Sequence, residues 1–224
     1  MFCPRSVSRT LAGVNLLLIA GPASSTLDEA RVITNRSSGH TGATIAQILQ
    51  RNSFKTTLWF GVDISYPLPK ELTPSARFRT VKDLEGLLSE NDLSTFDSIL
   101  LPAALPDYQL EKAYGPDGQE LNHHKWSGSL PKIHLELSPG PRILPNLRRM
   151  APHAKIIGWK WEADGSLEDL MTIARKQIRD CQTDACVLNG PAYGMGHLLV
   201  PVRGEPVPCA NSDELGEALV AFLK

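Results

Sequence analysis

The sequence lacks the features that mark a nucleic-acid-binding protein or a membrane protein. Its 224 residues include 23 Lys and Arg against 24 Asp and Glu, a formal net charge of −1, so no broad cationic surface is available for nucleic acid or anionic lipid. Beyond the N-terminal segment, no stretch approaches the roughly 20 apolar residues that cross a bilayer. We therefore expect neither nucleic acid nor a membrane as a partner, and any anionic ligand must be bound locally.

Cysteine is scarce, and its spacing argues against a structural metal site. The four cysteines show no C-x-x-C spacing and no partner histidine at zinc-site distances. In a chain of this length, scattered cysteines are more typical of buried thiols in a reducing compartment than of a disulfide framework. We therefore expect a cytoplasmic protein. The cysteines are Cys3, Cys181, Cys186 and Cys209.

The N-terminal segment has two interpretations. Two arginines precede an apolar run over residues 11–20 and small residues follow it, which is the outline of a secretory signal peptide. However, Asn15 interrupts the run, and its end at Gly21-Pro22 is typical of a buried parallel strand that enters a tight turn. We favour the strand, preceded by an N-terminal extension, residues 1–13, that we expect to be disordered.

The rest of the chain alternates between apolar strands and amphipathic helices. This alternation predicts a three-layer α/β/α Rossmann-like fold with a mostly parallel sheet, as a single domain over residues 14–224, with ligands at the carboxyl ends of strands. A polar segment over 111–131 is too long for a simple connection and predicts a mobile flap. The expected strands are 14–20, 56–60, 77–81, 96–104, 133–137, 154–160, 185–188 and 197–202, and the expected helices are 42–52, 83–93, 141–150, 167–181 and 212–223.

Two common nucleotide-binding fingerprints are missing. The sequence has neither G-x-G-x-x-G after the first strand nor the P-loop pattern, which disfavours a hydride-transfer enzyme and an ordinary P-loop kinase or ATPase. Instead, residues 30–42 supply hydroxyls, glycines and two arginines directly before a predicted helix, a suitable cradle for an anion. On composition alone, a capped polar turn explains this segment equally well.

The same segment, ARVITNRSSGHTG, resembles the R-x-I-T-N-R-S-S-G-x-x-G signature of the phosphopantothenoylcysteine synthetase family (phosphopantothenate-cysteine ligase), the C-terminal domain type of the DNA/pantothenate metabolism flavoprotein. Further similarities follow in the family's order and extend the resemblance over about residues 16–223. They are AALPDY at 103–108, His124-Lys125, LEL at 135–137, PRIL at 141–144, GWKWE at 158–162, ARK at 174–176 and the strand end at 184–189.

The resemblance implies a ligase of coenzyme A biosynthesis. Such an enzyme activates the carboxylate of 4′-phosphopantothenate with CTP or ATP and releases pyrophosphate, and the amine of cysteine then attacks the acyl-nucleotidylate. Its catalysis requires mainly positioning and charge stabilisation. The resemblance further implies a cytoplasmic homodimer and Mg²⁺ bound with the nucleotide. Some bacterial relatives are fused to a flavin decarboxylase half, which we expect this chain to lack, so we expect no flavin.

The resemblance implies catalytic roles for two residues. It places Asn35 against the acyl-nucleotidylate, where a neutral amide donates hydrogen bonds to developing oxyanion charge. It makes Lys125 a flap lysine over the triphosphate, whose charge grows as pyrophosphate departs. Without the resemblance, Asn35 is interpreted as a turn residue and Lys125 as a solvated loop residue.

The other implied contacts fall into two sets. Asp107 is also implied to hold Mg²⁺ together with phosphate oxygens, although an Asx-type turn equally explains it. By pattern alone, Trp159 is a core residue. The residues implied to bind the nucleotide are Ala103, Ala104, Asp107, Lys125, Pro141, Arg142, Ile143, Leu144, Trp159 and Lys176. Those implied to bind phosphopantothenate are Arg31, Asn35, Arg36, Ser37, Ser38 and Gly39.

The sequence departs from the family pattern at several cationic positions. His40 stands where many members have lysine, and Gln177 and Cys181 stand where the CTP-using members tend to have two lysines, with Lys176 one residue away. These differences motivate an alternative function, a catalytically degenerate nucleotide-binding or regulatory paralogue. A third hypothesis is an amide ligase for a related phosphorylated acid, with residues 24–31 as the selectivity loop.

Overall fold

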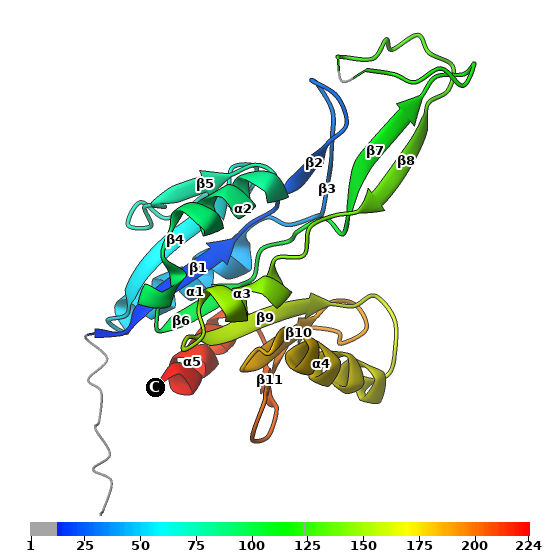
Figure 1. Ribbon diagram of the computed structural model, residues 1–224. Helices are drawn as coiled ribbons and strands as arrows, with labels where there is room; N and C mark the ends of the chain where they lie inside the picture. Colours follow the sequence, from blue (N-terminus) through cyan, green and yellow to red (C-terminus); the bar gives the residue numbers. More distant parts are fainter. Residues whose placement is uncertain (1–12, 123) are drawn as a thin grey trace, which may run out of the picture.

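A computed structural model describes residues 13–122 and 124–224, and its central element is an eight-stranded sheet (Figure 1). The strands are β1 (Asn15–Ala20), β4 (Lys55–Gly61), β5 (Ala76–Phe78), β6 (Ser98–Leu101), β9 (Lys155–Trp161), β10 (Ala185–Asn189), β11 (His197–Pro201) and β12 (Val207–Cys209). Their order is β12-β11-β10-β9-β6-β1-β4-β5, in which β11 is antiparallel to both of its neighbours, β10 and β12, and the other neighbouring strands pair in parallel. This confirms the predicted fold class.

The apolar run near the N-terminus forms a central strand. β1 lies between β4 and β6, and the side chains of Leu16 to Ala20 are fully buried. A parallel strand covered by helices on both faces must be apolar throughout, which explains why this run does not alternate. The strand prediction is therefore confirmed. The predicted disordered extension lies outside the described residues except for its last position, residue 13. Cys3 also lies outside the described residues.

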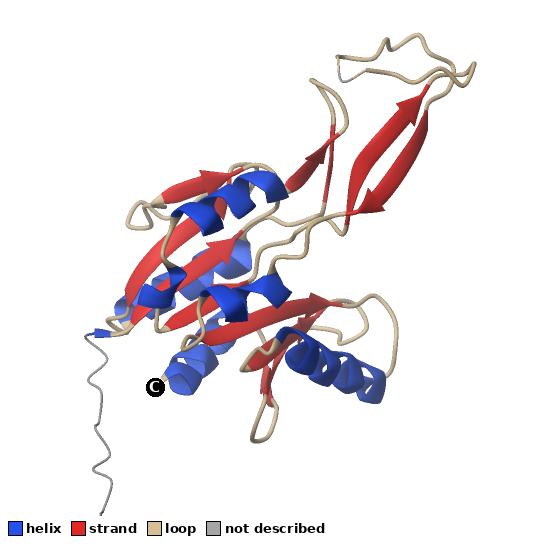
Figure 2. Ribbon diagram, viewed as in Figure 1, coloured by secondary structure: helices blue, strands red, loops and turns tan. Residues whose placement is uncertain are grey.

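Helices cover both faces of the sheet (Figure 2). α1 and α5 pack on one face, and α2 and α3 pack on the other. α4 joins the second face, because it packs on Cys186 and Leu188, whereas Ala185 and Val187 point to α1 and α5. No helix in the described part of the chain is long and apolar enough to span a membrane. The bounds are α1 (His40–Arg51), α2 (Val81–Glu90), α3 (Leu144–Met150), α4 (Leu167–Cys181) and α5 (Ser212–Leu223), with a 3-10 turn η2 (Leu93–Thr95).

Helix caps explain where the predicted bounds hold and where they shift. α4 begins after Ser166, whose hydroxyl accepts a hydrogen bond from the Asp169 amide in a capping box. α4 and α5 have the predicted bounds. The strand predicted over 77–81 ends early, at Phe78, because Thr80 caps α2, which therefore begins before the predicted residue 83. α1 begins two residues before the prediction, and α3 begins three residues after it.

Two antiparallel ribbons project from the carboxyl edge of the sheet and form an arm (Figure 1). One ribbon pairs β2 (Ser24–Thr26) with β3 (Val32–Thr34), and the other pairs β7 (Tyr108–Tyr114) with β8 (His134–Pro139). The predicted flap over 111–131 is therefore wrong at its start, where four residues belong to β7. β7 is largely exposed and polar, so it lacks the apolar alternation that identifies a half-buried strand.

The described cysteines are core side chains. Cys181, Cys186 and Cys209 are buried free thiols. Burial raises the pKa of Cys186 to about 12, with only a small opposing effect from the nearby Lys160. A thiol with such a pKa stays protonated near neutral pH and is a poor nucleophile. The Cys186 side chain therefore contributes to the packing of α4 against β10.

Candidate active site

A cleft of about 880 Å³ opens at the carboxyl edge of the parallel strands. Its walls come from the connection between β1 and α1, the segment after β6, and the ends of β9 and β10. In doubly wound α/β folds, this edge is where ligands bind. The lining residues are Gly21, Asn35, Arg36, Ser37, Ser38, Gly39, His40, Thr41, Gly42, Pro102, Ala103, Ala104, Leu105, Asp107, Trp159, Lys160, Trp161 and Asn189.

The first wall is the start of α1. Gly39 is the N-cap and adopts the left-handed conformation, with φ 83°, and a Cβ there would lie 2.7 Å from the Ile64 Cγ2 atom. At Gly42, a Cβ would lie 2.3 Å from the Ala20 Cβ, so the helix start is pressed against β1. The first turn thus lines the cleft, and its amide groups and dipole favour an anion.

The second wall brings Asn35 against the segment after β6. The Asn35 side-chain amide donates a hydrogen bond to the Leu105 carbonyl at 2.9 Å. The Ala104 amide donates to the Gly21 carbonyl at 3.0 Å, which fixes this segment beside the end of β1. The Asn35 side chain is exposed and forms no other hydrogen bond within the described residues, so its second N–H and its oxygen are available to a ligand.

The third wall combines Trp159, a predicted nucleotide contact, with Lys160, Trp161 and Asn189, to which sequence reasoning assigned no role. Trp159 is half-buried against the core under α1 and α5, whereas Trp161 is 60% exposed. The Lys160 ammonium lies 3.2 Å from a Glu162 carboxylate oxygen, and Asn189 lies opposite Trp161 in the register of β9 and β10. Lys160, Trp161 and Asn189 lie at the ends of two buried strands, and this position was the signal that could have identified them from the sequence. Thr41 and Gly42 of α1 fall within the predicted anion cradle over residues 30–42, although neither was assigned individually as a site residue.

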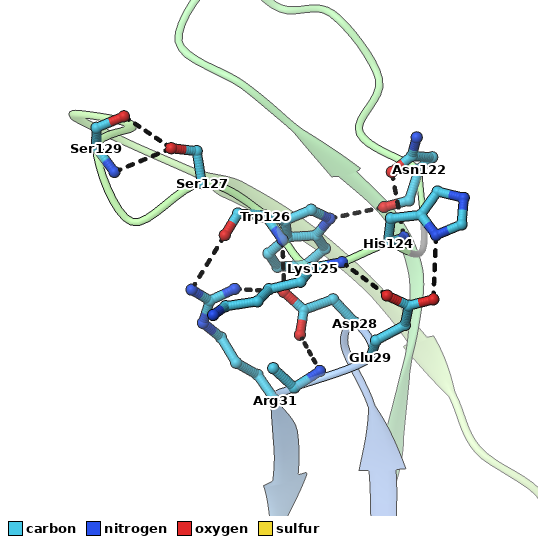
Figure 3. A network of polar contacts seen from close by, with 10 residues as sticks. Asp28, Glu29, Arg31, Asn122, His124, Lys125, Trp126, Ser127 and Ser129 are labelled. Carbon is cyan, nitrogen blue, oxygen red and sulfur yellow. Dashed lines mark hydrogen bonds and ion pairs between the residues drawn. The ribbon is translucent and has the colours of Figure 1, made fainter.

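Arg31 and Lys125, two of the predicted site residues, lie on the arm and not in the cleft. The turn between β2 and β3 docks against residues 124–126 (Figure 3). The buried Asp28 carboxylate accepts hydrogen bonds from the Trp126 amide at 3.0 Å and from the Arg31 guanidinium. The Arg31 guanidinium also donates to the Trp126 carbonyl at 3.3 Å. Arg31 is therefore held by protein groups, and it positions the segment that contains Lys125.

The charges of this cluster are stabilised locally. Burial raises the pKa of the Asp28 carboxyl, but the amides of Trp126 and Ala30 and the Arg31 guanidinium outweigh burial and hold this pKa below its ordinary value. The His124 ring, 3.0 Å from a Glu29 carboxylate oxygen, lowers the pKa of Glu29. Both carboxylates are thus ionised near neutral pH.

Five further predicted nucleotide contacts also lie outside the cleft, whereas Ala103, Ala104, Asp107 and Trp159 line it. Pro141 and Arg142 precede α3, Ile143 is buried, and Leu144 packs against Gly158, where a Cβ would lie 2.6 Å from its Cδ2 atom. Lys176 of α4 is paired with Asp180.

The residues that replace the family lysines face the sheet. The Gln177 side-chain NH₂ group donates a hydrogen bond to the Trp159 carbonyl at 3.4 Å. The Gln177 side-chain oxygen accepts a hydrogen bond from the Cys186 thiol at 3.6 Å. Cys181 is buried, and burial raises the pKa of its thiol. These two positions therefore supply no cation to the cleft.

The cleft has few groups that suit a metal ion. Asp107 supplies the single carboxylate among the described lining residues, and its side chain is exposed. Across residues 13–122 and 124–224, no group of three or more His, Cys, Asp or Glu side chains is arranged to hold a metal ion. The donor set therefore fits a Mg²⁺ ion that arrives with phosphate oxygens and shares one carboxylate.

The amino-acid sequence matches one family model and is similar to curated proteins. The family model of the DNA/pantothenate metabolism flavoprotein C-terminal domain matches residues 11–197. The coenzyme A biosynthesis bifunctional protein CoaBC of Thermococcus kodakarensis is 29% identical over 217 residues, which cover 94% of this chain and 51% of that protein. The chain thus spans about half the length of the curated relatives it matches.

Solved structures share the fold. The DNA/pantothenate metabolism flavoprotein from Streptococcus pneumoniae superposes with a TM-score of 0.81 at 22% identity, covering 94% of this chain and 98% of that one. A Cab2 mutant in complex with phosphopantothenate-cysteine superposes with a TM-score of 0.66 at 16% identity, covering 94% and 86%. At these identities, the likeness concerns the fold.

Proposed function

Because the chain belongs to the DNA/pantothenate metabolism flavoprotein C-terminal domain family, we propose that it is a ligase of coenzyme A biosynthesis that joins 4′-phosphopantothenate to cysteine. The observation that carries the proposal is the convergence of distant motif residues in one cleft. Residues 35–39, residues 103–105 with Asp107, and Trp159 come from three parts of the sequence and line the same cavity. Relatives named for coenzyme A biosynthesis and a fold neighbour bound to phosphopantothenate-cysteine support this substrate class.

In the proposed reaction, the cleft aligns two substrates before cysteine arrives. An oxygen of the phosphopantothenate carboxylate attacks the α-phosphorus of CTP or ATP, and pyrophosphate leaves. The amine of cysteine then attacks the acyl carbon, and the nucleoside monophosphate leaves with that carboxylate oxygen. Both nucleophiles are competent once they are aligned, so positioning supplies much of the rate enhancement.

The residues of the first two walls suit these steps. We propose that Arg36 to Gly39 and the first turn of α1 bind the phosphate of phosphopantothenate, since backbone amides and a guanidinium favour an anion. Asn35 is held beside Leu105 by one of its two N–H groups, and we propose that the other N–H donates to the charge that develops on the acyl group. Asp107 would hold Mg²⁺ with the nucleotide, and the ion would neutralise phosphate charge.

We propose a homodimer in which the arm of one subunit completes the cleft of the other. The phosphopantothenate-binding candidate Arg31 and the nucleotide-binding candidate Lys125 lie on the arm (Figure 3), whereas residues 35–39 line the cleft. The arm also exposes Val32, Leu135 and Leu137, and exposed apolar side chains of this kind are typical of an interaction surface.

Mixing two impaired variants, assayed at limiting nucleotide, tests this arrangement. Asn35→Ala disables the cleft and Lys125→Ala disables the arm, so a mixed dimer keeps one intact site only if the arm acts on the partner. We expect co-expressed variants to recover a rate of turnover that neither variant reaches alone. A monomer in solution, or mixtures no more active than the separate variants, would contradict the arrangement.

We also propose a cytoplasmic protein that acts as one domain over residues 14–224. The sheet runs continuously from β5 to β12 and carries all three hydrophobic clusters, which supports one cooperative unit. The buried free thiols Cys181, Cys186 and Cys209 are typical of a reducing compartment.

Product formation tests the proposed function. We expect purified protein with Mg²⁺, phosphopantothenate, cysteine and either CTP or ATP to yield a new species with the mass of phosphopantothenoylcysteine. Nucleotide binding without any product, with both nucleotides, would instead favour the degenerate paralogue. The sheet-facing side chains of Gln177 and Cys181 are the observation that keeps this second candidate in view. Product from a different phosphorylated acid alone would favour the third hypothesis.

A further inference from the structure

Trp161 differs from the other tryptophans of the chain in being exposed. Trp59 and Trp126 are 3% and 5% exposed, and Trp159 is half-buried, whereas Trp161 is 60% exposed. A tryptophan side chain offers a large apolar face, and leaving it in water gives up the free energy of burial. The ring lines the cleft, so a ligand in the cleft can cover it.

The backbone beneath this exposed ring is fixed. Trp161 is the last residue of β9 and pairs with Asn189 of β10. The next residue, Glu162, donates its amide to the Asn189 carbonyl at 3.0 Å and accepts from the Ala192 amide at 3.2 Å. At Gly190, a Cβ would lie 2.4 Å from the Glu162 carbonyl oxygen, so the two chain segments are in close contact. Trp161 is thus presented from a rigid strand end, so the backbone beneath it needs little ordering when a ligand binds.

The wall at the start of α1 is the proposed site for phosphate, and the Trp161 wall offers a flat apolar face. Among the described lining residues, the aromatic rings are those of His40, Trp159 and Trp161. The His40 ring packs edge-on against Tyr66, with ring centroids 4.6 Å apart, and Trp159 packs against the core. Trp161 therefore supplies the accessible aromatic face in the described cleft.

We propose that Trp161 is the stacking platform for the base of the nucleoside triphosphate, an inference that rests on the proposed ligase function. A base is the planar aromatic part of the proposed substrates, and phosphopantothenate and cysteine have none. Stacking on one open face accepts any base, because every base presents a π-face. Trp161 therefore contributes affinity for the nucleotide and does not choose between cytosine and adenine.

Binding measurements with three probes test the proposal without turnover. Calorimetric titration with CTP, ATP and inorganic tripolyphosphate separates the contribution of the base from that of the phosphates. We expect Trp161→Leu to weaken CTP and ATP binding by roughly 10-fold, the range of one aromatic stacking contact, and to leave tripolyphosphate binding unchanged. Trp161→Phe should restore most of the affinity, because it keeps a planar ring. Met195→Ala, which removes a side chain that is 93% exposed outside the cleft, is the matched control and should change nothing.

Several results would overturn the proposal. These are an unchanged affinity of Trp161→Leu for both nucleotides, an equal loss for tripolyphosphate, and no nucleotide binding by the wild-type protein. Product formation at saturating nucleotide, measured separately, distinguishes this failure from failure of the ligase function. Product with Trp161-independent binding refutes the stacking proposal alone, and Trp161-dependent binding without product refutes the ligase alone.

Discussion

Replacing Asn35 with alanine is expected to remove amide formation while leaving the protein folded. The side chain is exposed and makes one hydrogen bond within the described residues, to the Leu105 carbonyl at 2.9 Å. Exposed substitutions of this kind change the free energy of unfolding by about 0.5 kcal/mol or less. The stability of the variant should therefore be close to that of the wild-type protein.

The expected catalytic loss is much larger. Removing one donor directed at developing oxyanion charge costs about 10²- to 10³-fold in rate, or about 3–4 kcal/mol. The loss of transition-state stabilisation should thus exceed the loss of folding stability several-fold. Nucleotide affinity should change little, because the predicted role of Asn35 concerns the acyl group.

Three measurements separate these effects. Thermal unfolding reports stability, equilibrium titration reports nucleotide binding, and the rate of product formation at saturating substrates reports catalysis. Asn91→Ala is the matched control, because the Asn91 amide also donates to a backbone carbonyl, that of Leu87 at 2.7 Å, on an exposed surface away from the cleft. Normal turnover by Asn35→Ala, or an equal loss in the control, would refute the reasoning.

Three further predictions concern the arm, the start of α1 and a buried histidine. Lys125→Gln should lower the rate at limiting nucleotide, and unchanged initial rates would show that the arm lysine does not act on the nucleotide. Gly42→Ala places a Cβ 2.3 Å from that of Ala20, so urea unfolding should show a loss of about 1–3 kcal/mol, and full stability would contradict this packing. Burial, aided by His40, lowers the pKa of His197, so the unfolded state binds more protons as pH falls below the ordinary value of 6.5. The melting temperature of the wild-type protein should therefore fall as the pH is lowered from about 7.5 to about 5.5, and that of His197→Gln should fall less over the same range. Equal dependence of the two melting temperatures on pH would exclude His197 as the cause.

The buried parts of the fold could be predicted from the sequence. β1 reads as a continuous apolar run because helices cover both faces of its sheet, and α4 shows its bounds through apolar spacing and the Ser166 cap. The arm could be predicted only in part. Alternation predicted its strand β8 over 133–137, whereas β7 is exposed and polar at most positions and leaves no apolar period in the sequence.

The candidate site could be predicted in part. The segment 35–39 and Asp107 were assigned from the family motif, and the strand order brings them to one cleft. Trp161 was missed, because an apolar residue two positions after Trp159 suggests another core side chain. Its exposure depends on β9 extending beyond its helical cover, which is a tertiary property. That Arg31 and Lys125 lie on the arm also follows from tertiary pairing alone.

The central claim is that the cleft activates the carboxylate by attack on the α-phosphorus, and the path of one oxygen atom tests it most directly. Phosphopantothenate labelled with ¹⁸O in its carboxylate is incubated with cysteine, Mg²⁺ and either CTP or ATP, and the products are analysed by mass spectrometry. The account predicts one ¹⁸O atom in the released nucleoside monophosphate and none in pyrophosphate. Label in inorganic phosphate together with a nucleoside diphosphate, or no turnover with either nucleotide, would contradict it.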